Sequence, residues 1–249
     1  MCGRFVSASP PDEIARYFSA IGASEAAFEE LPEELTGPRY NVAPTDDVAV
    51  VLEQAGTRRV DALHWGLVPR WAKDPAIASR MINARAETLA ANNAFKHAFA
   101  RRRCLIPADG FYEWTTVAGQ KRKQPLLIRR RDGEPLAFAG IWEEWESPDH
   151  DGAGVIRSCT IITGPANDLV GTVHDRMPVI LPPGEWDAWL DVANRDTDRL
   201  APLLGPAPSE ILVMHPVSTD VNDVRNDGAH LINPVEPPAP PSDGQGTLL

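Results

Sequence analysis

The chain has 249 residues, of which 43% are hydrophobic and 24% are charged, and its formal net charge is −11 at pH 7. These are ordinary values for a globular protein, and the length suffices for a sizeable core in one domain or two small ones. No apolar run reaches the roughly 18 residues of a membrane-spanning helix, and the first residues lack the long apolar core of a secretory signal. A cytoplasmic protein is therefore expected.

The spacing of apolar residues predicts helices and strands in an irregular order. The first helix is expected over Pro10–Ile21, with Ser9 as its N-cap and Pro11 at its start. The later elements are strands over Val48–Leu52 and Val60–Trp65, a helix over Ala86–Arg101, strands over Leu105–Trp114, Pro125–Arg130, Leu136–Trp142 and Arg157–Thr163, helices over Gly184–Val192 and near Arg199, and a strand over Ile211–His215.

Strands outnumber helices and do not alternate regularly with them, which favours an α+β fold over a doubly wound sheet. We expect a single domain over residues 1–233, with a mostly antiparallel, barrel-like sheet flanked by helices. Residues 234–249 contain five prolines and little apolar content, so this tail is expected to be disordered.

The placement of charged residues and cysteines gives limited information about ligands and function. Five glutamates fall between Glu25 and Glu34, whereas ten Lys and Arg residues fall between Lys96 and Arg131. The basic segment is either a nucleic-acid contact or an ordinary basic surface. Three scattered cysteines do not make a disulfide framework, and without C-x-x-C or H-x-x-x-H pairs we expect neither a metal nor any other cofactor.

Cys2 is the residue with the most distinctive chemistry. Removal of Met1, by an aminopeptidase or autocatalytically, leaves a first residue that carries both an α-amine and a thiol. The amine has a pKa of about 7.7–8.0, so roughly a tenth of it is neutral and nucleophilic at pH 7. The amine can act as general base for its own thiol, which then attacks an amide. Alternatively, the amine condenses with an aldehyde and the thiol closes a five-membered thiazolidine ring. A third possibility is that Cys2 is incidental.

Seven sequence blocks then follow one another along the chain: Met1–Phe5 (MCGRF), Arg39–Pro44 (RYNVAP), Trp65–Trp71 (WGLVPRW), Ile82–Thr88 (INARAET), Pro107–Trp114 (PADGFYEW), His174–Pro178 (HDRMP) and His215–Ser218 (HPVS). In this order they resemble the SRAP family, the SOS-response-associated peptidases or abasic-site processing proteins. The resemblance covers residues 2 to about 233. It implies a monomeric α+β fold with a positively charged channel for single-stranded DNA, and a crosslink between Cys2 and the opened sugar of an abasic site.

The resemblance also implies that Asn83, Glu113 and His174 support Cys2. His174 can titrate near neutrality and is assigned to protonating the sugar oxygen, or else it contacts Asp175 or the backbone. Burial would raise the pKa of Glu113 and allow it to shuttle protons near the Cys2 amine, unless it pairs with an arginine instead. Asn83 is expected to hydrogen-bond the Cys2 backbone or the sugar, or to serve a turn.

Single-strand binding requires cations along a groove and flat side chains for bases. The candidates are Arg4, Arg85 and Arg176 for phosphates, Asn41 and Thr163 as assisting residues, and Trp71 and Trp114 for stacking at roughly 1–3 kcal/mol each. The other four tryptophans in the second half of the chain, Trp142, Trp145, Trp186 and Trp189, are expected in the core or on ordinary surface. Cys104 and Cys159 are expected to be inert buried thiols.

Two other functional classes remain open. Glutamine amidotransferases of the N-terminal-nucleophile class also begin Met-Cys-Gly, and they would release ammonia from glutamine. A non-catalytic single-strand binder would bind abasic DNA without forming a bond at Cys2. The partner expected on the first interpretation is single-stranded DNA with abasic sites, so the protein would associate with the nucleoid when bound; no membrane partner is expected.

Overall fold

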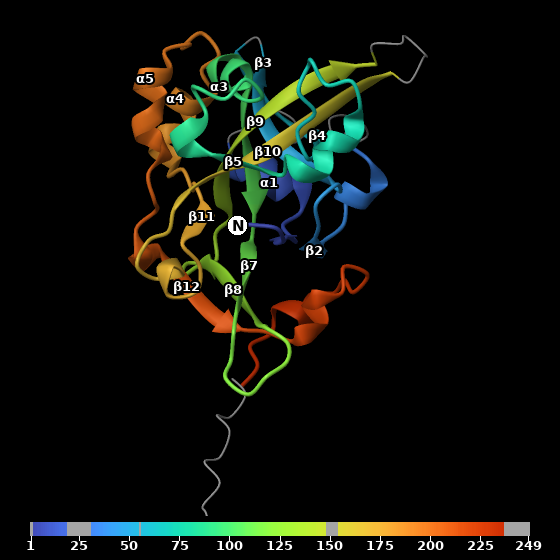
Figure 1. Ribbon diagram of the computed structural model, residues 1–249, viewed down its shortest axis with the longest axis vertical. Coiled ribbons are helices and arrows are strands. Elements are labelled where there is room, and N and C mark those ends of the chain that lie inside the picture. The colour runs from blue at the N-terminus through green and yellow to red at the C-terminus, as the bar shows by residue number, and fades with distance from the viewer. Residues whose placement is uncertain (1, 19–30, 55, 148–153, 237–249) are drawn as a thin grey trace, which may run out of the picture.

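The computed structural model describes residues 2–18, 31–54, 56–147 and 154–236 (Figure 1). Its strands are β1 (Phe5–Ser7), β2 (Arg39–Val42), β3 (Asp47–Gln54), β4 (Thr57–Trp65), β5 (Asn83–Arg85), β6 (Arg103–Ala108), β7 (Gly110–Thr115), β8 (Gln124–Arg130), β9 (Leu136–Glu146), β10 (Val155–Pro165), β11 (Arg176–Pro178) and β12 (Leu212–Pro216). Its α-helices are short: α1 (Pro11–Tyr17), α3 (Lys96–Arg101), α4 (Trp186–Leu190) and α5 (Thr197–Leu200). None of the helices in these ranges is long and apolar enough to cross a membrane.

A closed five-stranded barrel forms the larger part of the fold. Its strands run in the order β10-β4-β3-β6-β9, and β9 pairs with β10 to close the ring. Only the β4–β10 contact is parallel, so the barrel is mixed but mostly antiparallel. β5 and β11 extend the pairing along β10. The predicted α+β domain with a barrel-like sheet is confirmed.

A second sheet, with the strand order β12-β8-β7-β1-β2, is antiparallel throughout and lies below the barrel in the view of Figure 1. The chain passes from β6 in the barrel to β7 in this sheet at Asp109. The Asp109 carboxylate accepts hydrogen bonds from the backbone N–H groups of Ala8 and Ser9, at 2.5 and 2.9 Å. The single strand predicted over Leu105–Trp114 is therefore wrong, because Asp109 anchors a change of sheet in its middle.

The first helix begins where it was predicted, but its cap is different. Pro10 is the N-cap residue and makes no side-chain hydrogen bond to the helix. The Ser9 hydroxyl donates to the Asp109 carboxylate instead, so the expected capping role of Ser9 is wrong. The α-helix ends at Tyr17, and the rest of the predicted helix, from residue 19 to Ile21, lies outside the described residues.

The helix predicted over Ala86–Arg101 is regular only in its last part, as α3. The stretch before it holds one 3-10 turn at Ala86–Thr88. Asn92 then accepts the Ala94 N–H with its side-chain oxygen at 2.9 Å, a local bond that competes with helical pairing. Three large apolar side chains of this segment, Leu89, Phe95 and Phe99, are buried.

One core cluster joins the two sheets. Phe5 of β1 packs edge-on against Trp65 and Phe138 of the barrel, at ring-centroid distances of 5.2 and 6.2 Å. Cys104 and Cys159 are fully buried in the same cluster, and burial raises the pKa of both thiols. Their predicted burial is confirmed, and the raised pKa disfavours the reactive thiolate form. All four tryptophans predicted for the core or ordinary surface, Trp142, Trp145, Trp186 and Trp189, are buried.

The end of the described chain returns to the second sheet. Pro234 forms an isolated bridge with Val217, and the Val235 N–H donates to the Pro216 carbonyl at 3.0 Å. The tail predicted to be disordered over 234–249 lies outside the described residues from position 237 onward. Most of the acidic stretch from Glu25 to Glu34 lies outside them as well.

Candidate active site

The four predicted reactive residues come from four separate segments. Cys2 precedes β1, Asn83 begins β5, Glu113 lies in β7, and His174 lies just before β11. The Asn83 side-chain amide donates to the Cys2 carbonyl oxygen at 2.8 Å. β1 runs antiparallel to β7, and the Tyr112 N–H donates to the Arg4 carbonyl at 3.0 Å. Continuing this register brings the residues before Arg4 alongside Glu113.

Burial determines the protonation of Glu113 and Cys2. Glu113 is 3% exposed and Cys2 is fully buried. Burial raises the pKa of the Glu113 carboxyl, and the nearby His174 acts in the opposite direction. Burial also raises the pKa of the Cys2 thiol, and the charge of Glu113 adds to this rise. Burial thus disfavours the charged form of both groups in the folded chain.

His174 is oriented by contacts to its Nδ1 atom. The Arg176 backbone N–H donates to Nδ1 at 3.0 Å. The Arg176 carbonyl oxygen also lies 3.2 Å from Nδ1, so the contacts at this atom are compatible with either tautomer of the ring. An oxygen of the exposed Asp175 carboxylate also lies 3.2 Å from Nδ1. His174 thus makes the structural contacts considered for it, and its electrostatic effect on Glu113 shows that it also faces the site.

Comparison with known proteins shows the family to which the chain belongs. A family model described as "SOS response associated peptidase (SRAP)" matches residues 1–224. The chain belongs to the SRAP family. It is 39% identical over 232 residues to the abasic site processing protein YoqW of Bacillus subtilis, covering 93% of this chain and 99% of that protein. It is 32% identical over 237 residues to the abasic site processing protein YedK of Escherichia coli, covering 94% and 100%. A solved structure from Bacteroides thetaiotaomicron shares the fold, with a TM-score of 0.79, 22% identity, and coverage of 94% of this chain and 100% of that one.

Two of the predicted DNA-binding residues of this SRAP protein are engaged in internal contacts. The Arg4 guanidinium donates to the Asn41 side-chain oxygen at 2.6 Å and to the Val221 carbonyl at 2.9 Å. Asn41 is 5% exposed, and its amide donates to three backbone carbonyls between Val221 and Asn226. Asn41 therefore acts on the protein backbone, and one Nη atom of Arg4 is engaged inside the fold.

Arg176, Thr163 and Arg85 meet where β5 and β11 flank β10. Arg176 pairs with both carboxylate oxygens of Glu87 at 2.9 Å and donates to the Thr163 carbonyl at 2.6 Å. Thr163 is fully buried, and its hydroxyl has no hydrogen-bond partner in the described ranges. Arg85 pairs with Thr163 in register, and its side chain is exposed. Of these three residues, Arg85 offers its charge most directly to a ligand.

The two stacking candidates differ in how firmly they are held. Trp71 is 60% exposed, and its indole N–H reaches the Asn93 carbonyl at 3.4 Å. Trp114 is half-buried, and its indole N–H donates to the Asn222 side-chain oxygen at 2.6 Å. The Arg4 guanidinium lies over the Trp114 ring, 5.9 Å from its centroid. Trp114 is therefore fixed in orientation beside Glu113, its neighbour in β7.

The basic segment from Lys96 to Arg131 does not make one surface. Arg103 is 1% exposed and donates to four backbone carbonyls. Arg102 pairs with the buried Glu143, and Arg130 pairs with Asp132. Arg102 and Arg103 are thus used inside the fold, whereas seven of the ten basic side chains, among them Arg101 and Arg122, are exposed.

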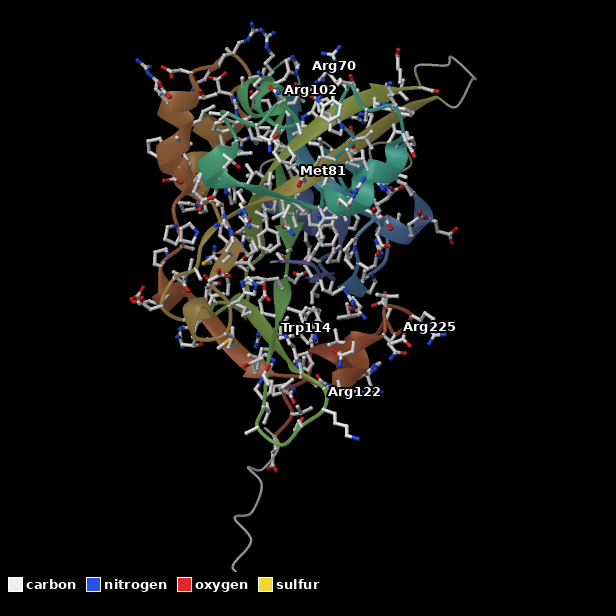
Figure 2. All side chains as sticks on the ribbon, in the orientation of Figure 1. Arg70, Met81, Arg102, Trp114, Arg122 and Arg225 are labelled. Atoms are coloured by element: carbon white, nitrogen blue, oxygen red, sulfur yellow. The ribbon has the colours of Figure 1, made fainter. Side chains whose placement is uncertain are left out.

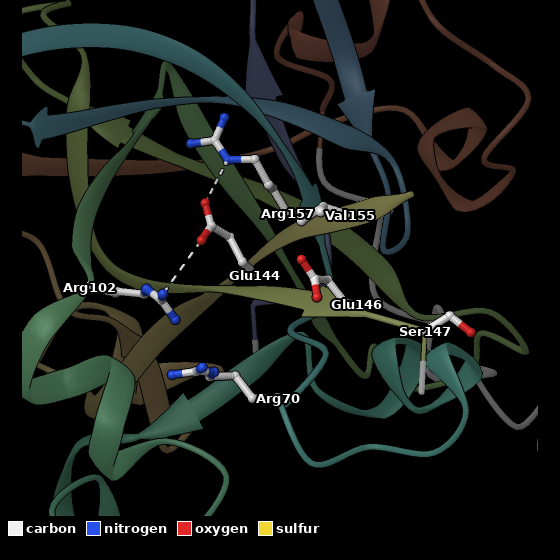
Figure 3. Close-up of a pocket in the computed structure, with 7 residues that line it drawn as sticks. All are labelled: Arg70, Arg102, Glu144, Glu146, Ser147, Val155 and Arg157. Atoms are coloured by element: carbon white, nitrogen blue, oxygen red, sulfur yellow. Dashed lines mark hydrogen bonds and ion pairs between the residues drawn. The ribbon is translucent and has the colours of Figure 1, made fainter. Parts of the chain in front are cut away.

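A hollow of about 640 Å³ at the outer ends of β9 and β10 is lined by Arg70, Arg102, Glu144, Glu146, Ser147, Val155 and Arg157 (Figure 3). Glu144 lies between two of its arginines, 3.5 Å from Arg102 and 3.7 Å from Arg157. Along β10 this end is about 20 Å from the Asn83 pairing at a rise of ~3.3 Å per residue. The hollow is separate from the reactive residues, and its charges largely neutralise one another.

Trp65 is a residue of the site that sequence reasoning missed. Its indole N–H donates to the Ile82 carbonyl at 2.9 Å, and the Leu67 N–H donates to the Met81 carbonyl at 3.1 Å. Together these bonds fix the backbone directly before Asn83. The tryptophan stood inside a recognised sequence block, but nothing in the sequence showed which backbone it would hold.

Proposed function

We propose that this SRAP protein forms a covalent thiazolidine crosslink between Cys2, after removal of Met1, and ring-opened abasic sites in single-stranded DNA. The crosslink would shield the site during repair. The observation that carries the proposal is the convergence of Asn83, Glu113 and His174 on Cys2. The names of the relatives at 39% and 32% identity support the substrate.

The raised pKa of the Cys2 thiol suggests an order of steps. The thiol stays protonated at neutral pH, whereas about a tenth of an ordinary α-amine is neutral and nucleophilic. The amine therefore attacks the sugar aldehyde first and forms a carbinolamine, which loses water to give an imine. The thiol sulfur then adds to the imine carbon, and its proton passes to the nitrogen. The balance is one aldehyde and one aminothiol converted to one thiazolidine and one water.

Glu113 and His174 provide the proton transfers that these steps need. An abasic sugar is mostly a closed hemiacetal, so ring opening requires a proton at the ring oxygen and loss of one from the anomeric hydroxyl. His174 is the group that we assign to the sugar oxygen. Glu113, buried and inclined to hold a proton, exchanges protons with the amine and with departing water. Ring closure by sulfur removes the imine, which would otherwise favour β-elimination of the 3′ phosphate.

The test is adduct formation on single-stranded DNA that carries one abasic site, read by denaturing electrophoresis. Mass spectrometry first establishes that Met1 is absent, and then that the adduct equals protein plus oligonucleotide minus one water. The unmodified chain is expected to shift the DNA. Cys2→Ser and a chain with an N-terminal tag are both expected to lose the shifted band.

Three other outcomes would overturn the proposal. A full-strength shift with Cys2→Ser or with the tagged chain would show that the bond forms elsewhere. Retained DNA binding without any adduct would identify a non-catalytic single-strand binder. Release of ammonia from glutamine, without an adduct, would identify an N-terminal-nucleophile amidohydrolase.

A further inference from the structure

We propose that the segment over residues 219–227 forms a wall of the single-strand groove, and that Asn222 is a positioning residue that sets the Trp114 indole for stacking on a DNA base. The inference rests on the proposed function, because it concerns how the strand is held beside Cys2.

The segment is fastened beside the reaction site by polar contacts from the N-terminal third of the chain. The Asn41 amide donates to the carbonyls of Val221, Asp223 and Asn226, at 3.3, 3.1 and 2.8 Å. The Tyr40 N–H donates to the Asp227 carboxylate at 2.6 Å. These bonds hold an irregular loop in a defined position relative to β1 and β2.

Arg4 links this loop to the reactive strand. Its guanidinium donates to the Val221 carbonyl at 2.9 Å and lies over the Trp114 ring. Burial lowers the pKa of Arg4, and its Nε atom is buried without a hydrogen-bond partner in the described part of the chain. Burial of a charged guanidinium with an unsatisfied donor is unfavourable. Its presence here supports a structural role for Arg4 in holding Cys2, Trp114 and the loop together.

Asn222 fixes the remaining freedom of Trp114. Arg4 lies over one face of the indole, and we assign the stacked base to the opposite face. The bond from the indole N–H to the Asn222 oxygen, at 2.6 Å, prevents the ring from turning about its own axis. Tyr112, also in β7, contacts Trp114 at a ring-centroid distance of 6.4 Å. The stacking surface is therefore pre-set before DNA arrives, which lowers the ordering cost of binding.

A path for the strand continues beyond Trp114. A hollow of about 540 Å³ is lined by Arg122, Thr219, Asp220, Asn222, Asp223, Val224 and Asn226. Asn222 thus both holds the indole and lines this hollow. Figure 2 shows Trp114 above Arg122 and beside the segment that carries Arg225. A nucleotide next to a base stacked on Trp114 would meet this hollow.

The experiment measures non-covalent affinity for single-stranded DNA in a Cys2→Ser background, so that binding is separated from crosslinking. Asn222→Leu replaces the side chain by one of similar size that lacks the hydrogen-bond acceptor. It is expected to weaken DNA binding about tenfold, because the stacking of one base on Trp114 would be partly lost. Val155→Ala, an exposed position in the separate hollow at the ends of β9 and β10, is the control and is expected to bind normally.

Two further measurements distinguish positioning from general damage. In a Trp114→Ala background, Asn222→Leu is expected to cause no additional loss, because Asn222 acts through Trp114. Trp114→Phe, which keeps a ring but lacks the N–H donor, is expected to weaken binding as Asn222→Leu does. With Cys2 restored, Asn222→Leu is expected to react normally with free 2-deoxyribose, which has no neighbouring base to stack.

Unchanged affinity in Asn222→Leu, or equal losses in the presence and absence of Trp114, would overturn the inference. So would an equal slowing of the reaction with free 2-deoxyribose, which would place the effect at Cys2 itself. Failure of the unmodified chain to form any adduct would refute the proposed function instead, and the affinity measurements in the Cys2→Ser background would still decide the role of Asn222.

Discussion

Replacement of Asn83 tests the geometry of the site most directly. Its amide donates to the Cys2 carbonyl at 2.8 Å, and its own side-chain oxygen is buried without a hydrogen-bond partner in the described ranges. Asn83→Asp keeps the size and shape of the side chain but turns the donor into an acceptor, so that two oxygens then face each other. Loss of such a bond, with a buried group left unsatisfied, costs about 1–3 kcal/mol. If this free energy is added to the activation barrier of the crosslinking reaction, the reaction slows about 5- to 150-fold.

The assay is the single-turnover rate of adduct formation with abasic single-stranded DNA at saturating protein. Asn83→Ala is expected to be slowed to a similar or smaller extent, because it removes the donor without adding a repelling oxygen. Melting temperatures show whether either variant is still folded at the assay temperature. A rate within twofold of the unmodified chain for a folded Asn83→Asp would show that this hydrogen bond does not organise Cys2.

Three further predictions concern stability. Glu113→Gln should abolish crosslinking yet raise the melting temperature near neutral pH. Because the pKa of Glu113 is raised in the folded chain, the unmodified protein loses stability as pH rises from about 4.3, the unfolded value, through the folded pKa. The gain in melting temperature should therefore vanish in acid, and a gain that is independent of pH would contradict this. Gly66→Ala places a Cβ 2.6 Å from a backbone oxygen at φ +143° and should cost about 2–4 kcal/mol by denaturant unfolding, whereas Gly37→Ala, with nothing within 4 Å, should be near neutral. Arg103→Met leaves four carbonyls without their donor and should lower the free energy of unfolding by about 3 kcal/mol or more. The exposed Arg101→Met should lower it by about 0.5 kcal/mol or less, and equal effects would show that Arg103 does not stabilise the fold through these bonds.

Local patterns predicted the long strands well but not the way they close. β3, β4, β8, β9, β10 and β12 all coincide with alternating or continuous apolar runs. The short strands β1, β2, β5 and β11 were missed, because three or four residues carry too little periodicity to stand out. Their positions depend on pairing with distant partners, such as Asn83 opposite Ile161. Asp109 shows the same limit, since its contact with Ala8 and Ser9 spans about a hundred positions.

The site shows a similar division. The type of residue and its sequence block were enough to predict Cys2, Asn83, Glu113 and His174 as a group, and the structure brings them near one another. Their protonation was not predictable in detail, because it depends on burial that only the packed sheets create. The proposed role of Asn222 could not be predicted from the sequence. It depends on one contact with an indole 108 positions away, and the residues around Asn222 do not indicate that partner.

The net charge of −11 has a physical consequence for the proposed reaction. Single-strand binders that rely on phosphate contacts hold DNA through many cations and release it as salt rises. Here Arg4 and Arg176 are engaged by protein oxygens, whereas Arg85 is exposed, so of these three candidate phosphate contacts only Arg85 offers its full charge. If non-covalent binding is weak and relies on stacking, the protein would dissociate readily from DNA that has no abasic site. A covalent bond at Cys2 would then supply the retention that electrostatics does not, and only where a sugar aldehyde is present.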